Sequence, residues 1–149
     1  MAEDAMSAAF AEARAAQARG ETPIGAAIAH DGAVIARAGN RTREDGDPTA
    51  HAEMLAIRAA AARLGSERLV DCDLYVTLEP CVMCVGAMVN ARIARVIYGA
   101  RDDKAGALGS VYDIGRDGRL NHRLEVVGGV MEFECAEIMR EFFRARRGG

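Results

Sequence analysis

Two short motifs in this chain bring together residue types that can bind a metal ion and move protons. The segment His51-Ala52-Glu53 precedes a second segment that contains Cys81 and Cys84. One imidazole and two thiols suit zinc, and three protein ligands leave a fourth tetrahedral position open, as in catalytic zinc sites. Glu53 stands two residues from the histidine, close enough to handle protons beside that position. The motifs therefore predict a catalytic zinc site with Glu53 as its proton carrier.

The thiols alone leave other interpretations open. A C-x-x-C pair is also typical of a structural zinc corner or a redox pair. A structural site with four ligands would have to recruit Cys72 or Cys135, whose spacing fits no ligand pattern, and both fit core positions as small hydrophobes. Joined to the upstream histidine and glutamate, the thiols complete the H-x-E…P-C-x-x-C signature of zinc-dependent nucleobase deaminases. This signature favours catalytic zinc over a structural or redox role.

The elements that position the two motifs follow from hydrophobic periodicity, capping residues and turn signals. The pattern predicts helices over 3–19, 50–64, 81–91 and 131–146, and strands over 24–29, 33–38, 74–78, 93–98 and 124–127. Both motifs then fall where a loop or strand gives way to the first turn of a helix. The positive end of a helix dipole favours thiolate over thiol at such a position. If the two helix N-termini face each other, the imidazole and both thiols meet.

The order of these elements indicates the fold class. Strands alternate with helices, which is typical of an α/β layered domain. A chain of 149 residues is long enough to bury one core, and it shows no internal repeat, low-complexity tract or linker. We therefore expect a single domain over residues 1–149.

Composition bears on location and partners. No apolar run approaches the roughly 20 residues that span a bilayer, and the acidic start of the chain differs from a secretory signal. We therefore expect a cytoplasmic protein without a membrane span. The net charge of −3 argues mildly against nucleic-acid binding. Residues 1–75 carry 8 basic and 12 acidic side chains, however, against 11 and 10 in residues 76–149. The arginines near the C-terminus either complement a helix dipole or meet phosphates.

Several segments together resemble bacterial tRNA-specific adenosine deaminases of the TadA type, in the cytidine-deaminase-like zinc deaminase superfamily. The segments that carry this resemblance are 47–53, 74–84, 99–104, 121–123 and 142–147. Free-base and nucleoside deaminases share the zinc motifs but are less similar in the last two segments. The resemblance implies a three-layer α/β/α cytidine-deaminase-like fold, with a central, mostly five-stranded mixed sheet flanked by helices. It also implies that residues 1–149 form one zinc-dependent domain of the CMP/dCMP-deaminase type.

The same resemblance implies an activity, a cofactor and partners. The expected reaction is hydrolytic deamination of adenosine to inosine at the wobble position of a tRNA anticodon, in an arginine tRNA. His51, Cys81 and Cys84 would hold one Zn²⁺ per subunit, and Glu53 would be the catalytic proton shuttle. The partners would be the tRNA anticodon stem-loop and a second copy of the chain in a homodimer. Two alternatives remain open: a small-molecule deaminase of guanine, cytosine or cytidine, and a non-catalytic, zinc-stabilised RNA-binding module.

The resemblance also assigns substrate contacts to six residues outside the zinc motifs: Asn40, Asp102, Lys104, Asn121, Phe143 and Arg147. Asn40 would hydrogen-bond the flipped-out base, and Asp102 and Lys104 would meet sugar and phosphate groups around it. The last three would lie further along the anticodon-loop surface. Simpler roles compete with these, because asparagines suit turns, loop charges suit solvent, and the helical spacing of Phe143 places it in the core.

Overall fold

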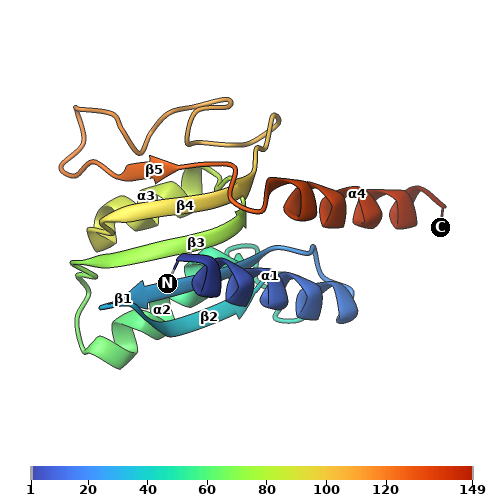
Figure 1. Ribbon diagram of the computed structural model, residues 1–149, viewed down its shortest axis with the longest axis horizontal. Coiled ribbons are helices and arrows are strands. Elements are labelled where there is room, and N and C mark those ends of the chain that lie inside the picture. The colour runs from blue at the N-terminus through green and yellow to red at the C-terminus, as the bar shows by residue number, and fades with distance from the viewer. Residues whose placement is uncertain (1, 149) are drawn as a thin grey trace.

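Five strands form the middle of three layers (Figure 1). This computed structural model describes the backbone of residues 2–148 and the side chains of residues 5–146. The strands are β1 (Gly25–His30), β2 (Ala33–Gly39), β3 (Cys72–Leu78), β4 (Arg95–Ala100) and β5 (Glu125–Val127). They lie in the order β2-β1-β3-β4-β5, with β1 antiparallel to β2 and β3, and with β3, β4 and β5 parallel. The sheet is therefore mixed, as the resemblance implied.

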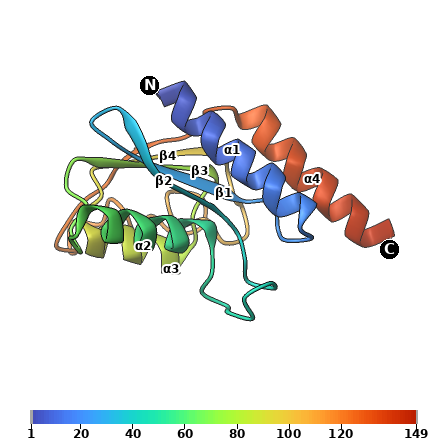
Figure 2. The same cartoon turned by 90° about the horizontal axis from the view of Figure 1, so that it is seen from below.

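Helices cover both faces of the sheet. They are α1 (Ala2–Ala18), α2 (Ala52–Leu64), α3 (Val82–Ala91) and α4 (Glu132–Gly148). Figure 2 shows α1 and α4 side by side on one face, and α2 and α3 on the other. This arrangement confirms the predicted three-layer α/β/α fold. None of the helices in the described range is long and apolar enough to cross a membrane.

The central strands are apolar on both faces because a helical layer packs against each face. Alternate residues of a strand point to opposite faces. Ile28 of β1 and Leu74 of β3 belong to the core cluster that α2 and α3 complete. Their neighbours Ala27 and Tyr75 instead pack with Met6 of α1. The short apolar runs that predicted these strands are thus a consequence of burial from two sides.

Small residues let α1 approach the sheet closely. Ala9 and Ala13 are fully buried, and a Cβ on Gly25 of β1 would come within 1.9 Å of the Ala9 carbonyl oxygen. Only glycine fits at that point of the strand. The small side chains of α1 and the glycine that starts β1 together allow this close packing of helix and strand.

One edge of the sheet gathers four segments from distant parts of the sequence. The parallel strands β3 and β4 both end there, since Leu78 pairs with Ala100. Because β1 is antiparallel to β3, it begins at this edge, and β2 ends beside it, with Gly25 opposite Gly39. Ligands of α/β proteins bind beyond the carboxyl ends of parallel strands. The topology therefore favours a site at this edge.

The two helices that carry the predicted metal ligands begin slightly later than the sequence predicted. Helices α2 and α3 start just after His51 and Cys81, which have extended backbones with ψ angles of 151° and 175°. The prediction included both residues in the helices. Before α2 the chain is held in a turn, in which the Thr49 N–H and hydroxyl donate to the Asp47 carboxylate at 2.8 and 2.7 Å. This turn delays the start of α2 and leaves His51 at its boundary.

Candidate active site

Three side chains meet where the N-termini of α2 and α3 lie together. His51 comes just before α2, Cys81 just before α3, and Cys84 lies in the first turn of α3. The His51 Nδ1 atom lies 3.6 Å from the Cys81 sulfur and 3.5 Å from the Cys84 sulfur. The three ligand atoms all lie within 4.8 Å of one another, close enough to bind one metal ion. The structure thus brings together the triad that the sequence predicted.

The two thiols differ in their affinity for a proton. Hydrogen bonds from Cys84 and then from His51 lower the pKa of the Cys81 thiol to about 3, against the effect of burial. The contact with Cys81, together with burial, raises the pKa of the Cys84 thiol. One thiolate is therefore favoured beside the imidazole, and a divalent cation deprotonates any further thiol that coordinates it. The positive ends of two helix dipoles also stabilise negative charge here.

Glu53 lies in the first turn of α2 and is buried. Burial raises the pKa of its carboxyl to about 7. A carboxyl with a pKa near neutral can both accept and release a proton under physiological conditions, as a general acid and base must. The position and the pKa of Glu53 therefore suit a proton carrier.

A cavity of about 140 Å³ opens onto these residues. It is lined by Ile24, His51, Glu53, Leu78, Glu79, Cys81, Asp102 and Ala105. These residues come from the start of β1, the ends of β3 and β4, and the starts of α2 and α3, which is the edge that the topology favours. Pockets for drug-sized ligands measure roughly 300–1,000 Å³, so this cavity suits a smaller group such as one planar base.

A second cavity, of about 340 Å³, shares Leu78 and Asp102 with the first and is also lined by Lys104 and Phe143. Helical periodicity predicted Phe143 in the core, and that prediction is wrong, because the residue is 47% exposed. Figure 1 shows α4 continuing beyond the sheet, so its last turns have no strand to pack against. The structure therefore brings three of the predicted substrate contacts, Asp102, Lys104 and Phe143, to a cavity that shares lining residues with the first.

The other three predicted contacts differ in their placement. Asn40 follows β2 and is 4% exposed, and its backbone N–H donates to the carbonyl of Ile24, which lines the small cavity. Asn121 is exposed in the connection between β4 and β5, outside the residues that line either cavity. Arg147 belongs to α4, and its side chain lies outside the described residues.

Two buried carboxylates near the site make contacts that the sequence did not indicate. Glu79, after β3, accepts hydrogen bonds from the backbones of Asp102 (3.2 Å), Leu108 (3.0 Å) and Ser110 (3.1 Å), and from the Ser110 hydroxyl. Burial opposes ionisation of Glu79, but these bonds outweigh it and lower the pKa of the carboxyl. Glu21 contacts the loop after β2. Because all these partners are distant along the chain, local sequence patterns carry no signal for the contacts.

The cysteines outside the triad occupy core positions, as predicted. Cys72 and Cys135 are fully buried, and the four cysteines form no disulfide. Among the residues that the structure describes, the group able to hold a metal is His51, Cys81 and Cys84. This geometry gives no support to a structural site with four ligands.

Known proteins match this chain over nearly its whole length. The model of the MafB19-like deaminase family matches residues 2–147. A tRNA-specific adenosine deaminase of Agrobacterium fabrum is 53% identical over 142 residues, which cover 95% of this chain and 93% of the relative. The chain belongs to the tRNA-specific adenosine deaminase family. It is therefore an enzyme of the deaminase class.

Solved structures of deaminases share the fold of this family member. One, from work on A-to-I editing by tRNA:A34 deaminases at the wobble position of transfer RNA, has a TM-score of 0.89 and 51% identity, and the match covers 91% of this chain and 99% of that one. A guanine deaminase from Nitrosomonas europaea has a TM-score of 0.78 and 29% identity, with 93% of this chain and 82% of that one covered. The tRNA-specific adenosine deaminase family and this guanine deaminase thus share the cytidine-deaminase-like fold.

The donor set of this tRNA-specific adenosine deaminase family member fits zinc. One imidazole nitrogen and two sulfurs are soft or borderline ligands, whereas magnesium and calcium prefer oxygen. The three ligands also lie beside a cavity, and a coordination position open to substrate or water distinguishes catalytic zinc from the closed structural kind. The triad can therefore hold a metal ion of the zinc type at the wall of the small cavity.

Proposed function

We propose that the enzyme hydrolytically deaminates adenosine to inosine at the wobble position of a tRNA anticodon, in an arginine tRNA. The observation that carries this proposal is the convergence of His51, Cys81 and Cys84 beside the buried Glu53 in one small cavity. The Agrobacterium relative and the tRNA:A34 deaminase structure support tRNA as the substrate. Loop bases suit such a cavity because they cost little to unstack.

The reaction replaces the amino group on C6 of the purine with oxygen from water and releases ammonia. His51, Cys81 and Cys84 would hold one zinc ion per subunit. When bound, the ion supplies Lewis acidity, which makes a water molecule a stronger nucleophile near neutral pH. The Glu53 carboxylate accepts a proton from the attacking water and donates it to the adjacent ring nitrogen. A second proton transfer through Glu53, to the amino group, lets ammonia leave while C6 becomes a carbonyl.

The remaining predicted residues would bind the RNA around the base. Asn40 hydrogen-bonds the base, and Asp102 and Lys104 meet its sugar and phosphates. The position of Asp102 between the two cavities supports this assignment, as does the exposed ring of Phe143 across the larger one. Asn121, Phe143 and Arg147 would form the outer anticodon-loop surface.

We also propose that residues 1–149 form one zinc-dependent domain of the CMP/dCMP-deaminase type, which works as a homodimer in the cytoplasm. Helix α3 supports a dimer, because it leaves Val82 exposed and Met83 half-buried. The free thiols support a reducing compartment. Light scattering on the purified enzyme measures its mass, and a monomer at micromolar concentration would contradict the dimer.

A second candidate function is deamination of a free purine base. The structural match to the Nitrosomonas guanine deaminase favours it, together with a cavity that has room for one base. On this hypothesis the enzyme turns over free guanine and is indifferent to the arginines at the end of α4.

The deciding experiment incubates the zinc-loaded enzyme with an unmodified arginine tRNA transcript that has A at the first anticodon position. Sequencing the RNA for A-to-G changes should find inosine at that position and at no other adenosine. A matched transcript with G at that position should be unchanged. Ammonia release from free guanine, cytosine or cytidine, with no change in the tRNA, would overturn the tRNA assignment. RNA binding without any deamination would favour the binding module.

A further inference from the structure

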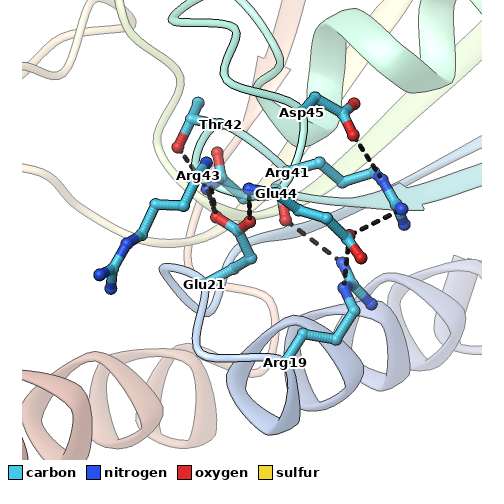
Figure 3. A network of polar contacts seen from close by, with 8 residues as sticks. Arg19, Glu21, Arg41, Thr42, Arg43, Glu44 and Asp45 are labelled. Atoms are coloured by element: carbon cyan, nitrogen blue, oxygen red, sulfur yellow. Dashed lines mark hydrogen bonds and ion pairs between the residues drawn. The ribbon is translucent and has the colours of Figure 1, made fainter.

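Glu21, in the connection between α1 and β1, is a buried carboxylate that accepts several hydrogen bonds from the loop after β2. It is 2% exposed. It accepts hydrogen bonds from the Asn40 side-chain nitrogen and the Arg43 N–H, both at 3.2 Å, and from the Glu44 N–H at 2.6 Å. Figure 3 shows Glu21 reaching into the loop between Arg43 and Glu44. Bonds between a charged group and backbone N–H groups are stronger than neutral ones, so this carboxylate fixes the loop.

The same loop is tied to the segment that carries the metal ligands. The Asn40 N–H donates to the Ile24 carbonyl at 3.0 Å, and the next N–H, from Arg41, donates to the Ala50 carbonyl at 3.0 Å. Ala50 immediately precedes His51, and Ile24 lines the small cavity. Glu21 therefore acts on a backbone segment that is already fixed against the site.

Glu21 also determines which way the Asn40 amide faces. An ionised carboxylate only accepts hydrogen bonds, so the amide nitrogen has to face it. The same nitrogen donates to the Thr42 hydroxyl oxygen at 3.1 Å. Both amide protons are then in use, and the Oδ1 atom of Asn40 is left for a ligand.

We propose that Glu21 is a positioning residue, which holds the Asn40 amide in the orientation that meets the base. This inference rests on the proposed function, in which Asn40 binds the base. Glutamine at position 21 has the same shape but cannot replace the carboxylate. Its own NH₂ group would face either the Glu44 N–H or the pair of donors from Asn40 and Arg43, and one of these contacts would be lost.

A double-mutant cycle of Glu21→Gln and Asn40→Ala tests the proposal. The kcat and KM values are measured on whichever substrate the wild-type enzyme deaminates, an arginine tRNA or free guanine, with zinc content recorded for each variant. We expect Glu21→Gln to lower kcat/KM at least about tenfold with zinc content unchanged. In the Asn40→Ala background the same substitution should change kcat/KM less than about twofold, because its effect passes through Asn40.

Equal effects in both backgrounds would overturn the proposal, since a general structural role is additive. Glu44→Gln is the matched control, because the Glu44 side chain pairs with Arg19 and Arg41 at 3.5 and 2.7 Å, and it should keep the wild-type kcat/KM. If Glu21→Gln does not fold, Thr42→Val takes its place in the cycle, because it removes the second acceptor of the same amide.

The two proposals fail separately in this experiment. A wild-type enzyme that deaminates free guanine but not tRNA contradicts the tRNA assignment, and the cycle on guanine still decides the role of Glu21. A wild-type enzyme that deaminates neither substrate contradicts both.

Discussion

Burial places Glu53 in the small cavity with a carboxyl pKa of about 7, so the group can hold or release a proton at physiological pH. Glu53→Gln keeps the size of the side chain and removes this ability. We expect deamination to fall by about 10²–10⁴-fold, the usual contribution of a general acid and base. Metal analysis should still find one zinc ion per subunit. An active Glu53→Gln enzyme would contradict the assigned role, and Glu67→Gln, at an exposed position after α2, is the control.

Cys72 differs from the ligand cysteines in its place in the fold, because it begins β3 and lies outside the group of three that could hold a metal. Burial raises the pKa of its thiol, and its sulfur lies 3.6 Å from Nδ1 of His30. Cys72→Ala should therefore keep one zinc ion per subunit, whereas Cys84→Ala removes one of the three ligands and should lose it. Zinc content measured by mass spectrometry separates these outcomes. Loss of zinc from Cys72→Ala would point to a structural metal site.

The sequence could identify a functional residue only where that residue belongs to a short motif with fixed spacing. His51 and Glu53 lie within one motif, and Cys81 and Cys84 within another, so their fixed spacing is visible in the amino-acid sequence alone. The role of Glu21 was not visible there, because its partners lie on a loop that only the folded sheet brings near.

At the scale of elements, periodicity predicted the helices and strands in their observed order. Their ends were less predictable, because a hydrogen-bonded turn or an extended ligand residue shifts a helix start without changing the apolar pattern. For the outer half of α4, helical spacing alone was misleading, because it favoured the core for Phe143. That apolar spacing continues past the edge of the sheet, where α4 has no strand to pack against (Figure 1). Phe143 is accordingly 47% exposed.

Two phenylalanines of α4 offer a matched test of RNA contact. Phe143 lines the larger cavity near Lys104, whereas Phe133 is 71% exposed in the first turn of the helix. Stacking of a base on an aromatic ring is worth about 1–3 kcal/mol. Phe143→Ala should therefore raise KM for tRNA by at least about fivefold, and Phe133→Ala should leave it unchanged. Steady-state kinetics on one transcript compare the two variants, and equal effects would count against a stacking role.

The connection between β4 and β5 is built around Glu79. A Cβ on Gly106 would lie 2.4 Å from the Glu79 carboxyl carbon and 2.6 Å from the Asp102 carbonyl oxygen. Gly106→Ala should therefore displace the loop that carries Asp102 and Lys104. We expect kcat/KM for tRNA to fall at least about tenfold, with a loss of stability of about 1–3 kcal/mol. Kinetics and thermal melting measure these effects, and a variant with wild-type values in both would contradict this account of the loop.

At the scale of the whole molecule, the site depends on strand order. The order β2-β1-β3-β4-β5 brings Ile24, Asn40, Glu79 and Asp102 to one edge of the sheet. Alternation of helices and strands predicted the class of fold, and the resemblance implied a mixed sheet. Neither periodicity nor turn signals specify which strands are neighbours, because pairing is a property of the folded chain. Only the structure could therefore show that these four segments meet.

Metal binding should stabilise this molecule without being required for its fold. The sheet packs against α1 through one apolar cluster and against α2 and α3 through another, so chelator-treated enzyme should keep its secondary structure. An ion at about 1,000 times its Kd adds about 4 kcal/mol to the free energy of unfolding, which for a chain of this size is about 10 °C in Tm. Thermal melting with and without chelator should show that difference for the wild type and none for Cys84→Ala. Unfolding on chelation would instead indicate a structural metal, and an unchanged wild-type Tm would indicate that no ion is bound.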